Sequence, residues 1–199
     1  VVGLVAGDDR TVLTGTPQFT TGARQGSSPG TYPVTVTGLS APNYEVEHQQ
    51  GAIEIERAPL TVRVRDVVKR YGAPVPAFVV TFDGFVLAES PAVLGGGPQF
   101  STAATQASPV GSYPVTATGL TSANYAIAYE PGTLRVDPAP LTVRARDTAK
   151  RYGAPLPAFG VAFEGFVLDD SPAVLTGRLR FATDATPASA VASYAVTPS

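Results

Sequence analysis

The chain has 199 residues, of which 15% are charged, and its formal net charge is −2. So weak a charge creates no field that would favour nucleic acid or anionic lipid as a partner. The absence of Cys excludes disulfides, thiolate metal sites and thiol nucleophiles, while 20 Gly and 19 Pro indicate short strands and turns rather than long helices.

The first predicted elements, in residues 1–57, are one helical turn and several short strands. Asp9 is a good capping residue for a single turn ahead of Leu13. Asn43 suits a turn position with positive φ, and Gly51 predicts a hairpin between the last two strands. The strands themselves are predicted around Phe19, Tyr32, Tyr44 and Ile53.

Residues 58–138 open with a joint and two alternating strands. Because each Pro fixes φ, the segment Glu56–Pro59 predicts a short and fairly stiff joint. From Leu60 to Asp66, Val62 and Val64 alternate with arginines, which predicts a strand with one apolar face. A second strand is predicted from about residue 78 to 85, with its inward face formed by Phe78, Val80 and Phe82.

A helical turn and four more strands complete this segment. Ser90 before Pro91 predicts an N-cap and the first position of a single helical turn, with Leu94 packed into the core. Asn124 and Gly132 repeat the turn signals of the first segment. The further strands are predicted around Phe100, Tyr113, Tyr125 and Leu134.

The last segment repeats the one before it without a gap. From Leu60 to Val115, 37 of 56 positions carry the same residue as the position 81 residues later. The same offset runs back into the first segment. The chain therefore divides into the C-terminal part of a first repeat (1–57), a complete second repeat (58–138) and the N-terminal part of a third repeat (139–199).

A unit of about 81 residues is large enough for a core of its own. We therefore predict an all-β fold of tandem small β-domains, either β-sandwich or β-grasp-like, each with one short helical turn. The two incomplete repeats should leave unpaired strand edges, so we expect them to be less ordered than the centre. We also expect that they could associate head to tail between molecules.

The ordered motifs of each repeat resemble a known family. Leu-Thr-Val-Arg-x-Arg-Asp is followed by Lys-Arg-Tyr-Gly, then by Ser-Pro-Ala-Val-Leu, Gly-Ser-Tyr-Pro-Val and Asn-Tyr. This order resembles the MBG repeat of the Tyr-Gly-x type, found in arrays in bacterial surface adhesins and haemagglutinin-like exoproteins. In the third copy, Ala192 and Ala195 replace Gly111 and Pro114. The resemblance implies an exported protein, extracellular or on the bacterial cell surface, and no catalytic residues.

No catalytic or metal-binding set is predicted from the residues either. His48 is the only His, and the matching position in the next repeat is Tyr129, which favours an exposed or structural role. Asp66 and Asp147 could mark a calcium site at a joint, but calcium needs about six to eight oxygen ligands and no Asp-rich loop is present. A turn cap or a surface ion pair is favoured. We expect no enzymatic activity and no cofactor.

The candidate ligand contacts lie on the first strand of each repeat and in the Tyr-Gly motif. The strand arginines could touch an acidic glycan, or they could guard an exposed sheet edge. The tyrosines could stack on a sugar, or lie at the edge of the core with bonded hydroxyls. These residues are Arg63, Arg65, Tyr71, Arg144, Arg146 and Tyr152.

Two functional hypotheses follow. The first is a non-catalytic spacer or stalk in a bacterial surface or secreted adhesin, which presents a distal binding region. The alternative is an adhesive module in which each repeat binds glycan or mucin. The expected partners are therefore a host or environmental glycan or protein, with no nucleic acid and no membrane insertion within this segment.

Overall fold

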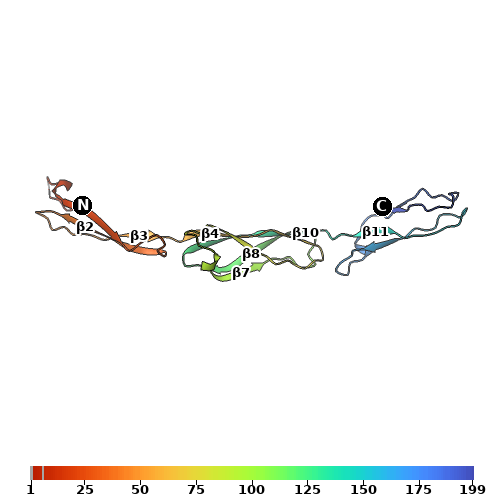
Figure 1. The fold of residues 1–199 in the computed structure, drawn as a ribbon, viewed down its shortest axis with the longest axis horizontal. Helices are drawn as coiled ribbons and strands as arrows, with labels where there is room; N and C mark the ends of the chain where they lie inside the picture. The colour runs from red at the N-terminus through yellow and green to blue at the C-terminus, as the bar shows by residue number, and fades with distance from the viewer. Residues whose placement is uncertain (1, 6) are drawn as a thin grey trace. The chain divides into compact units, whose positions relative to one another are not determined.

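The structure is a computed structural model that describes residues 2–5 and 7–199 (Figure 1). The described residues form short strands and 3₁₀ turns and contain no α-helix, so the fold is all-β. They divide into two compact units. The first holds the described residues up to Arg63, Val80–Gln99 and Ala117–Glu130, and the second holds Val64–Val79, Phe100–Thr116 and Pro131–Ser199.

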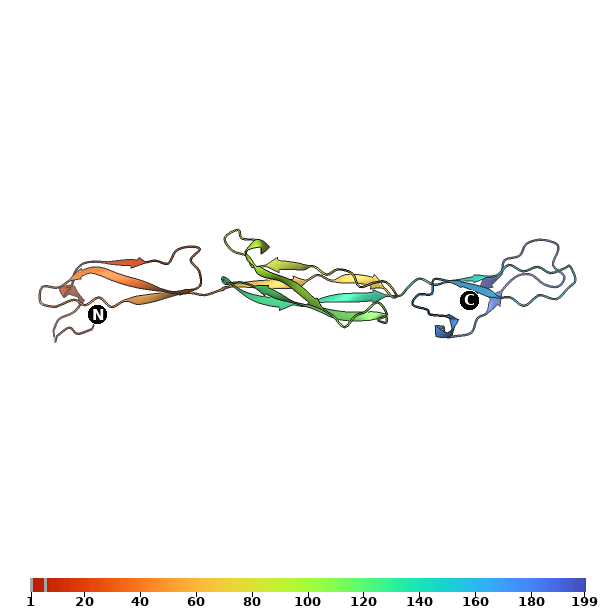
Figure 2. The ribbon, with the colours of Figure 1, turned by 90° about the horizontal axis from the view of Figure 1, so that it is seen from below.

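The middle repeat, residues 58–138, contains seven strands where six were predicted. Figure 2 shows this part of the chain in yellow to green. The additional strand is β5, in which Val-Val-Lys-Arg shows no alternation. Its geometry comes from parallel pairing with β10, where Val67 lies opposite Leu134. The seven strands are β4 (Ala58–Val64), β5 (Val67–Arg70), β6 (Val80–Asp83), β7 (Gly95–Ser101), β8 (Gly111–Thr121), β9 (Tyr125–Glu130) and β10 (Gly132–Asp137).

These strands form two sheets, with orders β6-β4-β9 and β5-β10-β8-β7. β9 pairs in parallel with β4, whereas β10 pairs with β5 and β8, so the predicted hairpin at Gly132 is wrong. The chain changes sheet at this glycine instead. A Cβ on Gly132 would lie 2.5 Å from the carbonyl oxygen of Val64, and only glycine permits so close an approach of two backbones. Two separate sheets favour the sandwich over a single β-grasp sheet.

The core lies in the middle repeat and follows the predicted alternation. On β4, Val62 and Val64 are buried, and on β6 the side chain of Val79 just before the strand is exposed while Val80 and Phe82 are half-buried. Burial of such aliphatic side chains contributes about 1.5–3 kcal/mol each to folding. The buried hydrophobic residues are Leu60, Val62, Val64, Ala104, Val115, Ala117, Tyr125, Leu134 and Val136.

The first repeat forms one three-stranded sheet, ordered β1 (Thr14–Thr21), β2 (Gly30–Ser40) and β3 (Gly51–Ile55). The strand predicted around Tyr44 is absent, and the segment that carries His48 is exposed and irregular. Its counterpart β9 pairs only with β4 in the middle repeat. Among the described residues, the Tyr44 segment forms one isolated antiparallel bridge, between Ala41 and Tyr44.

The third repeat forms two short ladders, β11 (Thr142–Ala145) with β12 (Val161–Glu164) and β13 (Phe181–Ala182) with β14 (Thr197–Pro198). The segment around Tyr194, which matches β8, is largely irregular. In the middle repeat that strand pairs with β10, for example Tyr113 with Leu134. None of the buried hydrophobic side chains in the described residues lies in the first or third repeat.

The three predicted helical turns form as 3₁₀ turns: η1 (Arg10–Val12), η2 (Pro91–Val93) and η3 (Pro172–Val174). Asp9 and Ser171 accept a hydrogen bond from a backbone N–H of their turn, whereas Ser90 makes no such cap. Leu94 is half-buried, but its counterpart Leu175 is 41% exposed, so packing of the turn into a core fails in the third repeat. None of the helices described is long and apolar enough to cross a membrane.

Two predictions about the backbone need correction. The non-glycine residues with positive φ are not Asn43 and Asn124 but Leu87, Ala88, Leu168 and Asp169. The first joint is also shorter than predicted. Ala58 and Pro59 already belong to β4, where they pair with β9, so only Glu56 and Arg57 separate β3 from β4.

Candidate functional site

The arginine stripe of the middle repeat is outward-facing but already paired. Nε of Arg63 donates to Oε2 of Glu130 at 2.6 Å, and both side chains are exposed. The Glu130 carboxylate raises the pKa of Arg63. β4 lies between β6 and β9, so the expectation that these arginines guard a sheet edge is wrong for this repeat. Arg65 is exposed beside them.

In the third repeat the stripe lies on β11, which pairs with β12. Nε of Arg146 donates to the carbonyl oxygen of Val161 at 3.1 Å, which is a contact within its own hairpin. Arg144 is exposed. Among the described residues neither Arg144 nor Arg146 forms a salt bridge, so the two stripes differ in their ion pairing although their sequences agree.

The Tyr-Gly motif forms a tight turn at the end of β5. The N–H of Ala73 donates to the carbonyl of Arg70 at 3.1 Å, and Gly72 has a φ of 80°. A positive φ at the third position is the requirement of a type II turn, which explains the glycine. Tyr71 is half-buried, its N–H donates to the carbonyl of Asp137 at 2.8 Å, and burial together with the Asp170 carboxylate raises its pKa.

Tyr152 occupies the same turn of the third repeat. Gly153 has a φ of 77°, and the N–H of Ala154 donates to the carbonyl of Arg151 at 3.1 Å. The side chain of Tyr152, however, is 70% exposed. The two predicted tyrosines therefore share a backbone conformation and differ in what covers their rings.

Lys69 is a structural residue that sequence reasoning missed. It is only 6% exposed, and its Nζ donates to the carbonyl oxygens of Ala73 at 3.1 Å and Gln106 at 3.0 Å. A buried ammonium needs such acceptors to replace water. The sequence signal that could have found it is the identical Lys150 in the same motif of the third repeat, beside apolar residues. Nζ of Lys150 donates to the carbonyl oxygen of Pro187 at 3.1 Å.

The tyrosines of the Asn-Tyr motif hold a distant loop through an acidic residue. The Tyr125 hydroxyl donates to Oε2 of Glu89 at 2.5 Å and accepts from the N–H of Val86 at 3.1 Å. In the first repeat, Tyr44 donates to Asp8 in the same way. Burial raises the pKa of Tyr125, and the bond to Asp8 raises that of Tyr44. The recurrence of an acid at positions 8, 89 and 170 was the available signal.

Asp66 connects the end of β4 to the start of β10 and does not cap a local turn. Its Oδ1 accepts from the backbone N–H of Thr133 at 2.7 Å, just after the chain changes sheet at Gly132. Across the described residues, no group of three or more His, Cys, Asp or Glu side chains is arranged to hold a metal ion.

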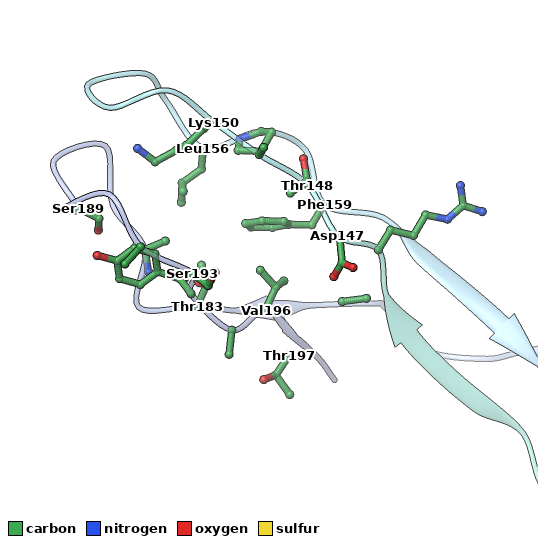
Figure 3. A pocket seen from close by; sticks show the side chains of 18 of the residues that line it. Asp147, Thr148, Lys150, Leu156, Phe159, Thr183, Ser189, Ser193, Val196 and Thr197 are labelled. Atoms are coloured by element: carbon green, nitrogen blue, oxygen red, sulfur yellow. Dashed lines mark hydrogen bonds between the residues drawn. The ribbon is translucent and has the colours of Figure 1, made fainter.

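The third repeat contains a cavity of about 740 Å³, lined in part by Leu156, Phe159, Thr183 and Val196 (Figure 3). Its walls are the segments that match β5 and β8. In the middle repeat the space between β5 and β8 is occupied by β10. The cavity has a mixed polar and apolar lining, and it lies between segments whose counterparts in the middle repeat flank β10.

Comparison with known proteins gives a single family. A family model described as the MBG domain (YGX type) matches residues 1–54, 60–135 and 141–199. No curated protein and no solved structure matches the chain significantly. Both Tyr-Gly turns, at Tyr71 and Tyr152, lie inside the matched residues. The chain is therefore a tandem array that belongs to the family of MBG domains of the YGX type.

Proposed function

We propose that the chain is a non-catalytic spacer segment of a bacterial surface protein or secreted adhesin, and that its repeats present a distal binding region. The observation that carries this proposal is the serial repetition of one small β-domain across the whole chain. Domains linked by very short joints add length to a chain at low cost in conformational freedom. An extracellular location follows from this role.

The pattern of variation between repeats supports a spacer. On β6 and β12 the inward residues Phe82 and Phe163 are the same, whereas the outward residues drift from Val79, Thr81 and Asp83 to Gly160, Ala162 and Glu164. A surface that binds the same ligand in every repeat would need its outward side chains to be kept. Here the packing is kept and most of this surface varies.

The candidate ligand contacts also favour the spacer. Arg63, which is the same in both copies, already has the Glu130 carboxylate as its partner. The cavity of the third repeat lies between segments whose counterparts in the middle repeat flank β10. A glycan site built from Arg63, Arg65 and Tyr71 would have to break the ion pair between Arg63 and Glu130.

A glycan array probed with the whole chain tests the proposal. We expect no saturable binding to neutral or acidic glycans and no difference between the parent and an Arg63→Ala, Arg65→Ala variant. Saturable binding that the double substitution abolishes would overturn the spacer and establish the adhesive module. The matched variant Arg144→Ala, Arg146→Ala shows whether each repeat would then carry its own site.

A further inference from the structure

A tight turn that begins with two apolar residues recurs in the second and third repeats. In the middle repeat it is Val86–Glu89, where the N–H of Glu89 donates to the carbonyl of Val86 at 3.0 Å. Its two central residues, Leu87 and Ala88, have φ of 55° and 57°. The third repeat has the same turn at residues 167–170, with φ of 54° and 63° at its centre. Such left-handed pairs of non-glycine residues cluster at functional positions.

The chain approaches the start of its repeat before it forms the turn. A Cβ on Gly84 would lie 2.5 Å from the carbonyl oxygen of Pro59 at the start of β4, and one on Gly165 would lie 2.3 Å from that of Pro140 just before β11. The turn therefore lies near the end of the repeat at which the chain enters.

Within the second compact unit, the turn of the third repeat packs on the Tyr-Gly turn of the middle repeat. A Cβ built on Gly72 would meet the side chain of Val167 at 2.5 Å from Cγ2 and 2.7 Å from Cβ. The absence of a side chain on Gly72 is thus what lets Val167 approach. Asp170, the last residue of the turn, faces the Tyr71 hydroxyl, and its carboxylate contributes to the raised pKa of that tyrosine.

The Tyr-Gly turn is held firmly enough to act as a docking edge. The buried Lys69 ammonium joins it to the loop that carries Gln106 through the carbonyls of Ala73 and Gln106. The Gln106 side chain returns a hydrogen bond from Nε2 to the carbonyl of Gly72 at 2.9 Å. Three hydrogen bonds therefore fix the edge from within its own repeat.

The two copies of each element provide an internal comparison. Where a turn packs on the edge, Tyr71 is half-buried and Gly72 has no room for a Cβ. Where no turn packs, Tyr152 is 70% exposed and a Cβ on Gly153 would meet nothing within 4 Å. The two edges have the same sequence, and they differ in two contacts of the middle repeat: the packing of Val167 on Gly72 and the bond of Tyr71 to Asp137.

The first joint repeats the contact in a second form. Within the first compact unit, a Cβ on Gly26 would lie 3.7 Å from Cδ1 of Leu87, at van der Waals contact. Gly26 belongs to the loop that matches the one carrying Gln106. Leu87 of the middle repeat therefore lies close to the loop of the first repeat that matches the Gln106 loop.

We propose that this contact is a docking interface repeated along the array: the apolar turn of each repeat seats on the Tyr-Gly edge of the repeat before it. The interface goes beyond the proposed spacer function, because it concerns how adjacent repeats are held together and not which binding region the array presents. The exposed edge at Tyr152–Gly153 is then the acceptor for the same turn of a further repeat of this type.

The chain supplies a matched pair of glycines that tests the proposal. Gly72→Ala and Gly153→Ala carry the same cost of a positive φ, but only the first also displaces Val167. We would place spin labels at Ser112→Cys and Glu164→Cys, which are exposed positions in a chain without native Cys, and measure their distance distribution. We expect one narrow peak for the parent and for Gly153→Ala, and loss of that peak for Gly72→Ala.

A second variant leaves the backbone of the edge untouched. Val167→Ser removes the apolar contact while its counterpart Val86→Ser serves as the control, and we expect only the former to broaden the distribution. A broad distribution in the parent, or equal widths for Gly72→Ala and Gly153→Ala together with a narrow Val167→Ser, would overturn the interface. Because the readout is the distance between two repeats, its failure is distinct from the appearance of glycan binding.

Discussion

At the scale of single residues, polar side chains in the middle repeat act mainly as cross-links between distant loops. Tyr125 ties the Val86–Glu89 turn to β9, and Lys69 ties the Tyr-Gly turn to the loop around Gln106. In a domain this small, a few buried hydrogen bonds to loop backbone restrict segments that no regular ladder holds. Substitution of either residue should therefore be felt across the whole repeat.

The tyrosine cross-link predicts a pH dependence. The pKa of Tyr125 is raised in the folded chain by burial and by Glu89, so its contribution to stability is complete below an unfolded pKa of about 10. That contribution is lost as the pH rises through the higher folded value. We expect the thermal midpoint to fall above pH of about 10, and to fall less in Tyr125→Phe, as measured by circular dichroism. An equal fall of the thermal midpoint at alkaline pH in the parent and in Tyr125→Phe would show that Tyr125 is not the source of the pH dependence.

The lysine cross-link predicts an asymmetry between two identical motifs. Lys69→Met leaves buried carbonyl oxygens without a donor and should lower the free energy of unfolding by about 1–3 kcal/mol. Lys150→Met, in the third repeat, should have a smaller effect because the matching nitrogen lies in a more exposed site. Urea denaturation of the two variants measures the difference, and the idea fails if Lys150→Met is the more damaging.

At the scale of elements, the two crossings between sheets organise the middle repeat. β4 leads into β5 and β9 leads into β10, and both resulting pairs, β4–β9 and β5–β10, are parallel. Gly132 makes the second crossing possible because the Val64 carbonyl leaves no space for a side chain. Glycine is required at this crossing because there is no space for a side chain, and not because of its φ, since Gly132 is not among the residues with positive φ.

This steric role predicts a contrast between two glycines. Gly132→Ala should destabilise the chain by about 1–3 kcal/mol, the usual cost of overpacking a tight site. Gly97→Ala in β7 is the control, because its Cβ would meet nothing within 4 Å. Thermal unfolding of the two variants should give a lower midpoint only for Gly132→Ala. A comparable fall of the thermal midpoint in both variants would show that replacing any glycine of these strands is destabilising, and that the Val64 carbonyl is not the cause.

The sequence predicted the elements whose signal is local and missed those that depend on distant partners. Alternation located β4, β6 and β8 and the inward side of each, because burial on one face of a strand imposes a period of two. β5 carries no such period and exists through β10. The positive φ of Leu87 and Ala88 could not be read from residue types that normally avoid it, whereas Asn was the expected choice.

The candidate site was predicted in its residues but not in their environments. Tyr71 and Tyr152, or Arg63 and Arg144, stand in nearly identical local sequences. Their exposure and pairing differ because their neighbours come from segments far along the chain, such as Glu130 for Arg63. Local patterns contain no information on which of two equal motifs will find its partner.

At the scale of the whole molecule, the third repeat has a groove of mixed polarity between the segments that match β5 and β8, which β10 separates in the middle repeat. Added strands bind such grooves through backbone hydrogen bonds, with alternate side chains in the pockets. We expect a peptide with the sequence of Gly132–Asp137 to bind there and to slow amide exchange around Tyr194. A peptide with Asp in place of Leu134 and Val136 is the control, and equal protection by both would exclude strand addition.

The same groove is the basis for expecting association between molecules. The first repeat contains β3, the counterpart of β10, so one molecule could offer to another the strand type that its third repeat lacks. We expect the apparent mass in light scattering to rise with concentration, and the peptide to reverse that rise. A chain that stays monomeric at high concentration would contradict head-to-tail association.

The parallel pairing of β5 with β10 has a mechanical consequence. The chain enters the repeat along one member of each parallel pair and leaves it along the other, so tension between the two ends slides the paired strands lengthwise. Their hydrogen bonds are then loaded together rather than opened one after another. We expect force spectroscopy to show a single high rupture force for this repeat.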